Sequence, residues 1–176
     1  MTIDQMISDR IRLRMFNKED ALFLLELCSS PNWLAMLGKR NINNLKSAER
    51  HLKNFILKEY SDHQYGFYAI ESIEHQKTIG LCGITLRNTQ EIPDLGFGIL
   101  PQYAGQGFSY EAARLVLQHT KDSFSFEKID AFATPTNIPS QKLLKKLGFV
   151  FLEEIFHTEF HAWVKHYRLE MNHLPQ

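Results

Sequence analysis

A strand, a glycine-rich turn and a helix follow one another in mid-chain, and this succession constrains the fold more than any other feature. Asp94–Leu100 is apolar and aromatic, the turn Gln102–Gly107 follows it, and Ser109–Lys121 is rich in Ala and Leu. The first N–H groups of a helix have no partner inside it, and the helix dipole adds partial positive charge there. Because Gly105 and Gly107 tolerate positive φ and leave room beside the backbone, such a turn suits a phosphate.

Glycines at these positions are also common in a tight turn that binds nothing. The turn matches neither of two well-known nucleotide-binding motifs. A Walker loop requires Gly-Lys-Ser/Thr, and no such triplet follows Gly107. A dinucleotide fingerprint requires a glycine three residues further on, where Tyr110 stands. The turn therefore predicts either another type of anion site or only a tight turn.

Three segments resemble the GNAT acetyltransferases, and in particular their RimJ/RimL-like branch. Gln-x-x-Gly-x-Gly and the run to Ala112, within 102–112, are similar to the loop that binds the pyrophosphate of acetyl-coenzyme A. Ser8–Arg14 with Asp20 resembles the branch's opening strand and first helix. Asn137–Ser140, followed by Leu-Gly-Phe at 147–149, resembles its second cofactor segment.

This resemblance covers nearly the whole chain and implies an α/β (α+β) fold. The expected GNAT fold has a mixed, mostly antiparallel central sheet that is split between two strands, with helices on both faces. The split holds the pantetheine arm of acetyl-CoA in that family. The implied cofactor contacts are Phe97, Gly98, Ile99, Gln102, Gly105, Gln106, Gly107, Phe108, Ser109, Asn137 and Ser140.

Length and composition fit a single domain over residues 1–176. Lys and Arg together number 20, as do Asp and Glu, so the formal net charge of zero argues against an obligate nucleic-acid partner. Cys28 and Cys82 lie in unrelated segments and are expected to be reduced thiols in a cytoplasmic protein. Met1–Arg14 lacks the apolar core of a signal peptide, and no apolar run has the length of a membrane span.

Hydrophobic periodicity and capping residues predict the other elements. The expected strands are 10–16, 65–72, 77–87, 128–134, 149–156 and 162–171. Further helices are expected to begin near Asn17, Ser47 and Asn137, the last ending with Gly148 in its left-handed C′ position. Core-facing apolar residues are expected to include Phe55 in the Ser47 helix and Trp163 in the last strand.

Two aromatic residues could belong to the acceptor site. Helices in this part of the chain wall that site in the resembled superfamily, so Trp33 and Tyr60 are candidates for a substrate pocket. Ordinary packing aromatics are the alternative.

Acyl transfer from a thioester to an amine requires a neutral amine, donors for the oxyanion and a proton for the leaving thiolate. Many GNAT enzymes carry a Tyr acid where this chain has Leu144, so that acid is absent here. The RimJ/RimL-like branch instead has Asn and Ser three residues apart, as Asn137 and Ser140 are. The resemblance thus implies that Ser140 assists the thiolate, although a Ser in the first helical turn is also a common local cap.

The sequence indicates the general base less clearly than the group that assists the thiolate. Related sequences often carry a carboxylate where Asp94 stands, and Asp, being shorter than Glu, would need a water relay. The alternative is a solvated carboxylate at the start of a strand. Glu153, Glu154 and Glu159 are later carboxylates that could also serve.

Other chemistries fit the sequence poorly. His157, His161 and His166 have spacings that do not place three imidazoles on one face of a strand, so no metal is expected. Ser-His-Asp hydrolysis would need a Gly-x-Ser-x-Gly elbow, which is missing.

The resulting functional hypothesis is acetyl transfer from acetyl-CoA to a primary amine. The branch suggests the N-terminal α-amine of a protein, but relatives also modify small amines such as polyamines, amino acids and antibiotics. An acyl-CoA-binding module with weak or no catalysis is the alternative from another class. Neither nucleic acid nor membrane is an expected partner, and both a monomer and a homodimer remain open.

Overall fold

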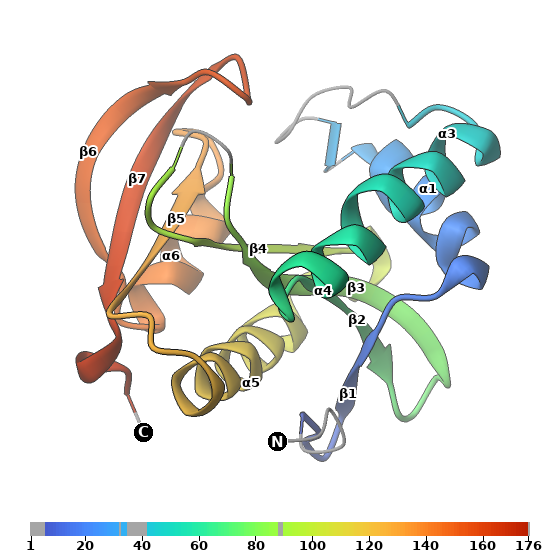
Figure 1. The fold of residues 1–176 in the computed structure, drawn as a ribbon, viewed down its shortest axis with the longest axis horizontal. Helices are drawn as coiled ribbons and strands as arrows, with labels where there is room; N and C mark the ends of the chain where they lie inside the picture. Colours follow the sequence, from blue (N-terminus) through green and yellow to red (C-terminus); the bar gives the residue numbers. More distant parts are fainter. Residues whose placement is uncertain (1–5, 32, 35–41, 88–89, 176) are drawn as a thin grey trace.

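The computed structural model describes residues 6–31, 33–34, 42–87 and 90–175 (Figure 1). Seven strands form one sheet in the order β1-β2-β3-β4-β5-β7-β6. Their bounds are β1 Ile11–Met15, β2 Phe67–Ser72, β3 Lys77–Thr85, β4 Asp94–Ile99, β5 Lys128–Ala133, β6 Val150–His157 and β7 Ala162–Glu170. The expected mixed, mostly antiparallel sheet is confirmed, because β4 and β5 are its one parallel pair in the described residues.

Helices precede and connect these strands. They are η2 Lys18–Asp20, α1 Ala21–Ser29, α3 Leu45–His51, the π-helical turn η3 Leu52–Ile56, α4 Leu57–His63, η4 Pro101–Tyr103, α5 Phe108–Ser123, α6 Ile138–Lys146 and η5 Met171–His173. None of the helices in the described ranges is long and apolar enough to cross a membrane. Helix α3 begins at Leu45, two residues before the expected start at Ser47, because Asn44 caps it and accepts from the Ser47 N–H at 2.9 Å.

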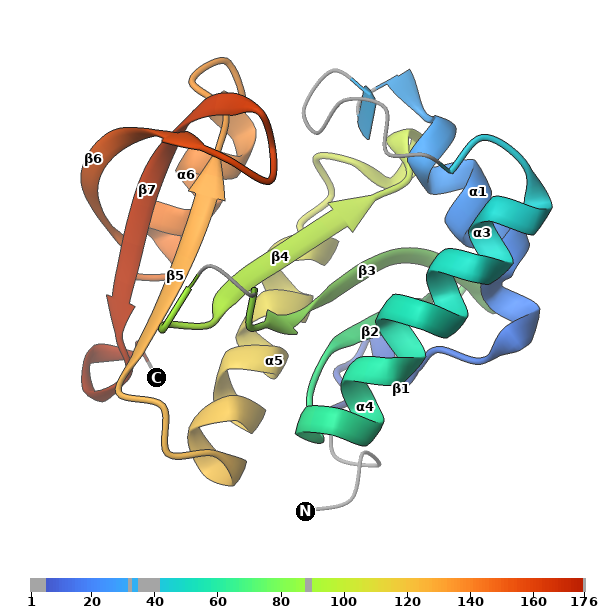
Figure 2. The same ribbon diagram turned by 45° about the horizontal axis from the view of Figure 1, so that its top comes forward.

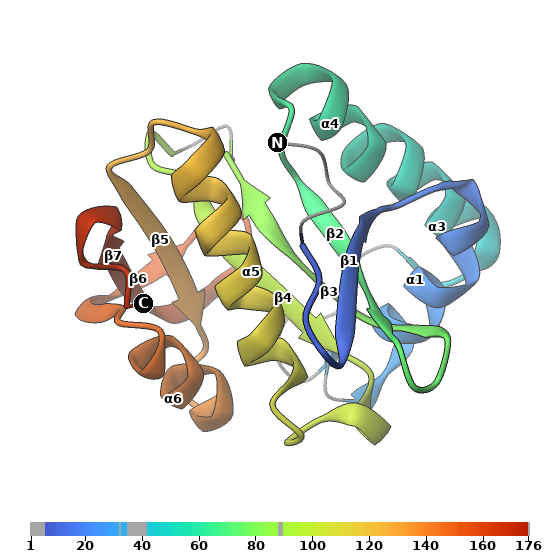
Figure 3. The same ribbon diagram turned by 90° about the horizontal axis from the view of Figure 1, so that it is seen from below.

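Helices cover both faces of the sheet, as expected. Helix α5 packs against β1, β3 and β4 on one face (Figure 3), and α1, α3 and η3 cover the other. Alternate residues of β3 enter the two resulting cores: buried Cys82 joins the α5 side and Leu81 the α1 side. The period of two along the strand therefore builds two hydrophobic layers from one element.

The sheet splits between β4 and β5. These strands pair in register only at Asp94 and Asp130, where the Asp130 N–H donates to the Pro93 carbonyl at 2.9 Å. Figure 2 shows the two strands diverging from there toward their carboxyl ends. The predicted split is confirmed, and it leaves one backbone edge of β4 without a strand partner among the described residues.

Two predicted core residues are instead exposed, so both predictions are wrong. Phe55 is 61% exposed and lies in the π-helical turn η3, whose wider winding shifts the side chains out of the expected α-helical register. Trp163 is also 61% exposed. It pairs with Phe156 across the β6–β7 hairpin, near the turn, where the hairpin extends past the helices (Figure 1), while its neighbour Val164 is buried.

Candidate active site

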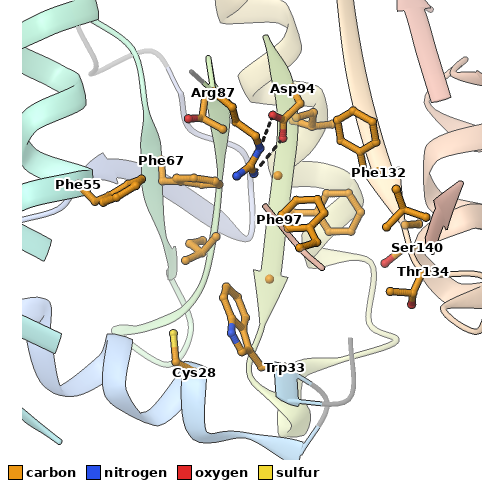
Figure 4. Close-up of a pocket in the computed structure, with 18 of the residues that line it drawn as sticks. Cys28, Trp33, Phe55, Phe67, Arg87, Asp94, Phe97, Phe132, Thr134 and Ser140 are labelled. Carbon is orange, nitrogen blue, oxygen red and sulfur yellow. Dashed lines mark hydrogen bonds and ion pairs between the residues drawn. The ribbon is translucent and has the colours of Figure 1, made fainter. Parts of the chain in front are cut away.

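A cavity of about 410 Å³ lies where the sheet splits. Strand β4 forms its floor, the end of β5 and the start of α6 form one wall, and α1, η3 and α4 form the other. Figure 4 shows Ser140 and Thr134 on one side of β4, with Phe55 and Phe67 on the opposite side. The cavity therefore joins the predicted second cofactor segment to the helices expected to wall the acceptor.

The glycine-rich loop follows β4 at the open end of the split. Gly105 and Gly107 both have positive φ, at 76° and 87°, and Gly107 is the N-cap of α5. The first helical hydrogen bond runs from the Glu111 N–H to the Gly107 carbonyl at 3.1 Å, so the N–H groups of Phe108 and Ser109 precede it. A Cβ atom on Gly105 would meet no heavy atom within 4 Å. These backbone groups can thus face an anion in open space.

Arg10, which sequence reasoning did not single out, holds this loop in place. Its Nη1 donates to the Gln106 carbonyl at 3.0 Å, its Nε donates to a Glu111 carboxylate oxygen at 2.8 Å, and its guanidinium lies 4.7 Å from the Phe108 ring centroid. Ser8 also donates to Glu111. The opening segment is therefore tied to the start of α5.

The predicted cofactor residues fall into two groups. Phe97, Gly98 and Ile99 line the cavity from β4, and Asn137 and Ser140 line it from the start of α6. The loop residues from Gln102 to Ser109 lie outside the cavity lining, beyond the end of β4. Gln102 and Gln106 contact one another there, since the Gln106 side chain donates to the Gln102 carbonyl at 3.0 Å.

The start of α6 presents hydroxyl groups to the cavity. The Asn137 side chain accepts from the Ser140 N–H at 3.1 Å, which leaves the Ser140 hydroxyl to the cavity side of the helix. Leu144 is fully buried in the core, so it takes no part in the cavity. Thr134 was missed by sequence reasoning. Its hydroxyl is buried, lines the same wall, and has no hydrogen-bond partner in the described part of the chain.

Asp94 is 2% exposed, so the alternative of a solvated carboxylate is wrong. Arg87 holds both its oxygens, with Nε to Oδ1 at 2.7 Å and Nη2 to Oδ2 at 3.3 Å, and Figure 4 shows this pair at the cavity. The same guanidinium contacts Glu159 at 3.1 Å and lies 4.7 Å from the Phe160 ring centroid. Burial raises the pKa of Asp94 against the opposing pull of Arg87.

Glu59 on α4 is a second carboxylate in the cavity lining, and sequence reasoning missed it. The Thr85 hydroxyl donates to its Oε1, and no ion pair to it occurs within the described residues. Burial raises the pKa of Glu59, and Thr85 and Arg87 counteract this only in part. Helix α4 carries one other acid, Asp62, which is exposed, and no sequence signal distinguished Glu59 from it.

Of the two predicted pocket aromatics, the structure brings one into the cavity. Trp33 lines it and packs on β4 so closely that a Cβ atom on Gly98 would lie 2.6 Å from the indole. Tyr60 is not among the described lining residues. Its hydroxyl donates to the Phe67 carbonyl and accepts from the Phe16 N–H at 3.1 Å. Tyr60 thus ties α4 to the first two strands.

The three histidines that were considered as metal ligands make different contacts. His166 pairs with Asp130 at 2.9 Å, His157 stacks on Phe160 with centroids 4.1 Å apart, and His161 lines the cavity. Within the described ranges, no three His, Cys, Asp or Glu side chains gather as a metal site would require.

Comparisons with known proteins agree on what this geometry defines. The profile of the family described as "Acetyltransferase (GNAT) domain" matches residues 10–150. An uncharacterized N-acetyltransferase, p20, from Bacillus licheniformis is 25% identical over 148 residues, covering 84% of this chain and 83% of that protein.

Two solved structures share the fold. The ribosomal-protein-S5-alanine acetyltransferase from Vibrio fischeri has a TM-score of 0.79 at 16% identity, covering 97% of this chain and 98% of that one. RimL, a ribosomal L7/L12 α-N-protein acetyltransferase solved with coenzyme A, also has a TM-score of 0.79, at 14% identity over 93% of this chain and 96% of that one.

A split mixed sheet with a glycine loop at a helix start is the arrangement that these structures share with this chain. The family match covers most of the chain, and the chain therefore belongs to the GNAT acetyltransferases. Its activity is that of an acetyl-CoA-dependent acetyltransferase.

Proposed function

We propose that this protein transfers the acetyl group of acetyl-CoA to a primary amine bound in the cavity beside β4. The supporting observation is that one continuous cavity joins the split and the start of α6 to two carboxylates, Asp94 and Glu59. An acyl-CoA-binding module would need the first part of this arrangement but not the second.

The residues at the split fit the pantetheine arm of acetyl-CoA, which carries the thioester at one end and the pyrophosphate at the other. The free edge of β4 offers backbone groups from Phe97 to Ile99, and the open space at Gly105 leaves room for phosphate beside the first N–H groups of α5. Thr134 lines the same split with a buried hydroxyl that has no hydrogen-bond partner within the described ranges. When bound there, acetyl-CoA supplies an activated acyl group, while the protein binds and orients it.

Ser140 and Asn137 serve the leaving-group side. The Asn137 side chain fixes the first turn of α6 through the Ser140 N–H, so the Ser140 hydroxyl is held at the cavity wall. A hydroxyl is too weak an acid for full proton transfer at neutral pH, so its role is to donate a hydrogen bond to the sulfur, directly or through water.

The carboxylates serve the amine side. A primary ammonium must lose a proton before it can attack, and Glu59 is the better acceptor because it is held by the Thr85 hydroxyl and carries no ion pair among the described residues. Asp94 is bound on both oxygens by Arg87. Asp94 therefore contributes negative charge and positions Arg87, and it accepts the proton only through water.

RimL is an α-N-protein acetyltransferase, so the α-amine of a protein N-terminus is one of the primary amines to test as the acceptor. The test is a thiol-release assay with acetyl-CoA and a panel of peptides, polyamines, amino acids and aminoglycosides, with the product identified by mass spectrometry. Amine-dependent release together with an N-acetylated product supports the proposal. Binding of coenzyme A without turnover on any amine would favour a binding module instead.

A further inference from the structure

One row of residues on the cavity face of β4 consists of a carboxylate followed by two glycines. Asp94, Gly96 and Gly98 are alternate residues and therefore share one face of the strand. A Cβ atom on Gly96 would lie 2.8 Å from the Phe67 ring, and one on Gly98 would lie 2.6 Å from the Trp33 ring. The glycines thus admit two aromatic rings against the strand, in line with the acid.

The two ends of this row differ in charge. At the Asp94 end, Arg87 forms ion pairs with Asp94 and Glu159, and Glu59 is a third carboxylate that interacts with its charge. These three carboxylates outnumber the guanidinium. The Trp33 end is about 13 Å further along the strand, by the usual rise per residue. Among the described residues, its cavity neighbours include Leu24, Cys28 and Ile42, all apolar.

Phe55 adds a third ring to the same wall. It is 61% exposed in η3, it stacks on His51 with centroids 5.1 Å apart, and both residues line the cavity. Figure 4 shows Phe55 beside Phe67, with Trp33 further along β4 and the Arg87–Asp94 pair at the other end. A large apolar ring that lines a cavity without being buried offers surface for a ligand to cover.

From this row we propose that the acceptor is a small primary amine carried on an apolar, aromatic-sized body, such as an arylalkylamine. The ammonium lies at the Glu59 and Asp94 end, and the ring lies against Phe67 and Phe55, on the side toward Trp33. This rests on the proposed acetyl transfer and names its substrate class. A polyamine is disfavoured because its second ammonium would lie at the apolar end, where the described lining offers no carboxylate.

The experiment compares kcat/KM for 2-phenylethylamine, tryptamine, butylamine, putrescine, spermidine and a hydrophilic peptide with a free N-terminus. We expect the two arylalkylamines to exceed each of the others at least tenfold. We also expect Phe55→Ala to raise KM for 2-phenylethylamine about five- to tenfold while changing KM for butylamine less than twofold. Phe151→Ala is the matched control, because Phe151 is also exposed, at 44%, but lies on β6 outside the cavity lining.

Several outcomes would overturn the substrate class. Spermidine or the peptide could be the best substrate, or Phe55→Ala could behave like Phe151→Ala. These outcomes would leave acetyl transfer intact. Failure of the proposed function looks different, because then no amine in the panel releases thiol, whether or not coenzyme A causes a thermal shift in the wild-type protein.

Discussion

The two halves of the cavity are built from different parts of the polypeptide. On the cofactor side, most of the groups that face a ligand belong to the backbone: the free edge of β4, the loop at Gly105 and Gly107, and the first N–H groups of α5. On the acceptor side, the groups are side chains that come from separate helices and loops, such as Trp33, Phe55 and Glu59. One half thus binds what all family members share, and the other can vary without disturbing it.

If the acceptor side depends on side-chain pairs, breaking one should cost the most stability. Asp94→Asn leaves the Arg87 guanidinium, whose side chain is 13% exposed, without its bidentate partner. We expect the free energy of unfolding to fall by about 3 kcal/mol or more, as for other broken buried pairs. Urea titration measures it, and Glu59→Gln, which removes no ion pair, is the matched control.

An equal loss of stability in the Asp94 and Glu59 variants would show that the Arg87 pair does not organise the acceptor side. Full activity of Asp94→Asn across the pH range would also remove Asp94 from the proton path.

On the cofactor side, the backbone conformation should matter more than any side chain. Coenzyme A at about 100 times its Kd should stabilise the wild-type protein by roughly 2.7 kcal/mol. Gly107→Val should abolish most of this gain, because Val disfavours φ of 87° and its side chain crowds the phosphate position. Gly105→Asn is the graded control, since Asn tolerates positive φ and a Cβ there meets no atom within 4 Å. A coenzyme A shift that is unchanged in Gly107→Val would refute the loop assignment.

Ser140 lies where the two halves of the cavity meet, and replacing it should lower kcat without weakening the binding of coenzyme A. We expect Ser140→Ala to lower kcat by about 10- to 100-fold, or roughly 1.4 to 2.7 kcal/mol of transition-state stabilisation. The Asn137 cap accepts from a backbone N–H, so the variant keeps it and the helix start should be preserved. Stopped-flow thiol release measures kcat, and an unchanged value would return Ser140 to a purely local role.

The smallest effect should be a shift in pH dependence. Glu59 accepts a proton only when ionised, and burial raises its pKa, so kcat/KM should fall as pH drops, starting above the ordinary range for a glutamate. Glu59→Gln should lower the rate about tenfold and abolish this acidic limb. An acidic limb that survives in Glu59→Gln would assign it to another group, with Asp94 the first to examine.

What could be predicted from the sequence follows the same division. The positive φ of Gly107, the Asn137 cap and the split of the sheet were predicted because each depends on local residue types or on the family pattern. Glu59 and Thr85 were missed because they lie 26 residues apart in sequence and meet only through the packing of α4 on the sheet. No local pattern encodes such a contact.

The aromatic residues of the cavity illustrate the same limit. A helical period predicted that Phe55 faces the core, but the π-helical turn directs it to the cavity. Trp33 was proposed as a pocket residue from its place in the chain alone, whereas its contact with Gly98 depends on the tertiary fold.

The most direct test is to incubate the wild-type protein with acetyl-CoA and the amine panel and to quantify free thiol and N-acetylated product in the same samples. We predict one thiol released for each amine acetylated, with negligible release when the amine is omitted. Saturable binding of coenzyme A with no acetylated amine in any sample would contradict the proposed function.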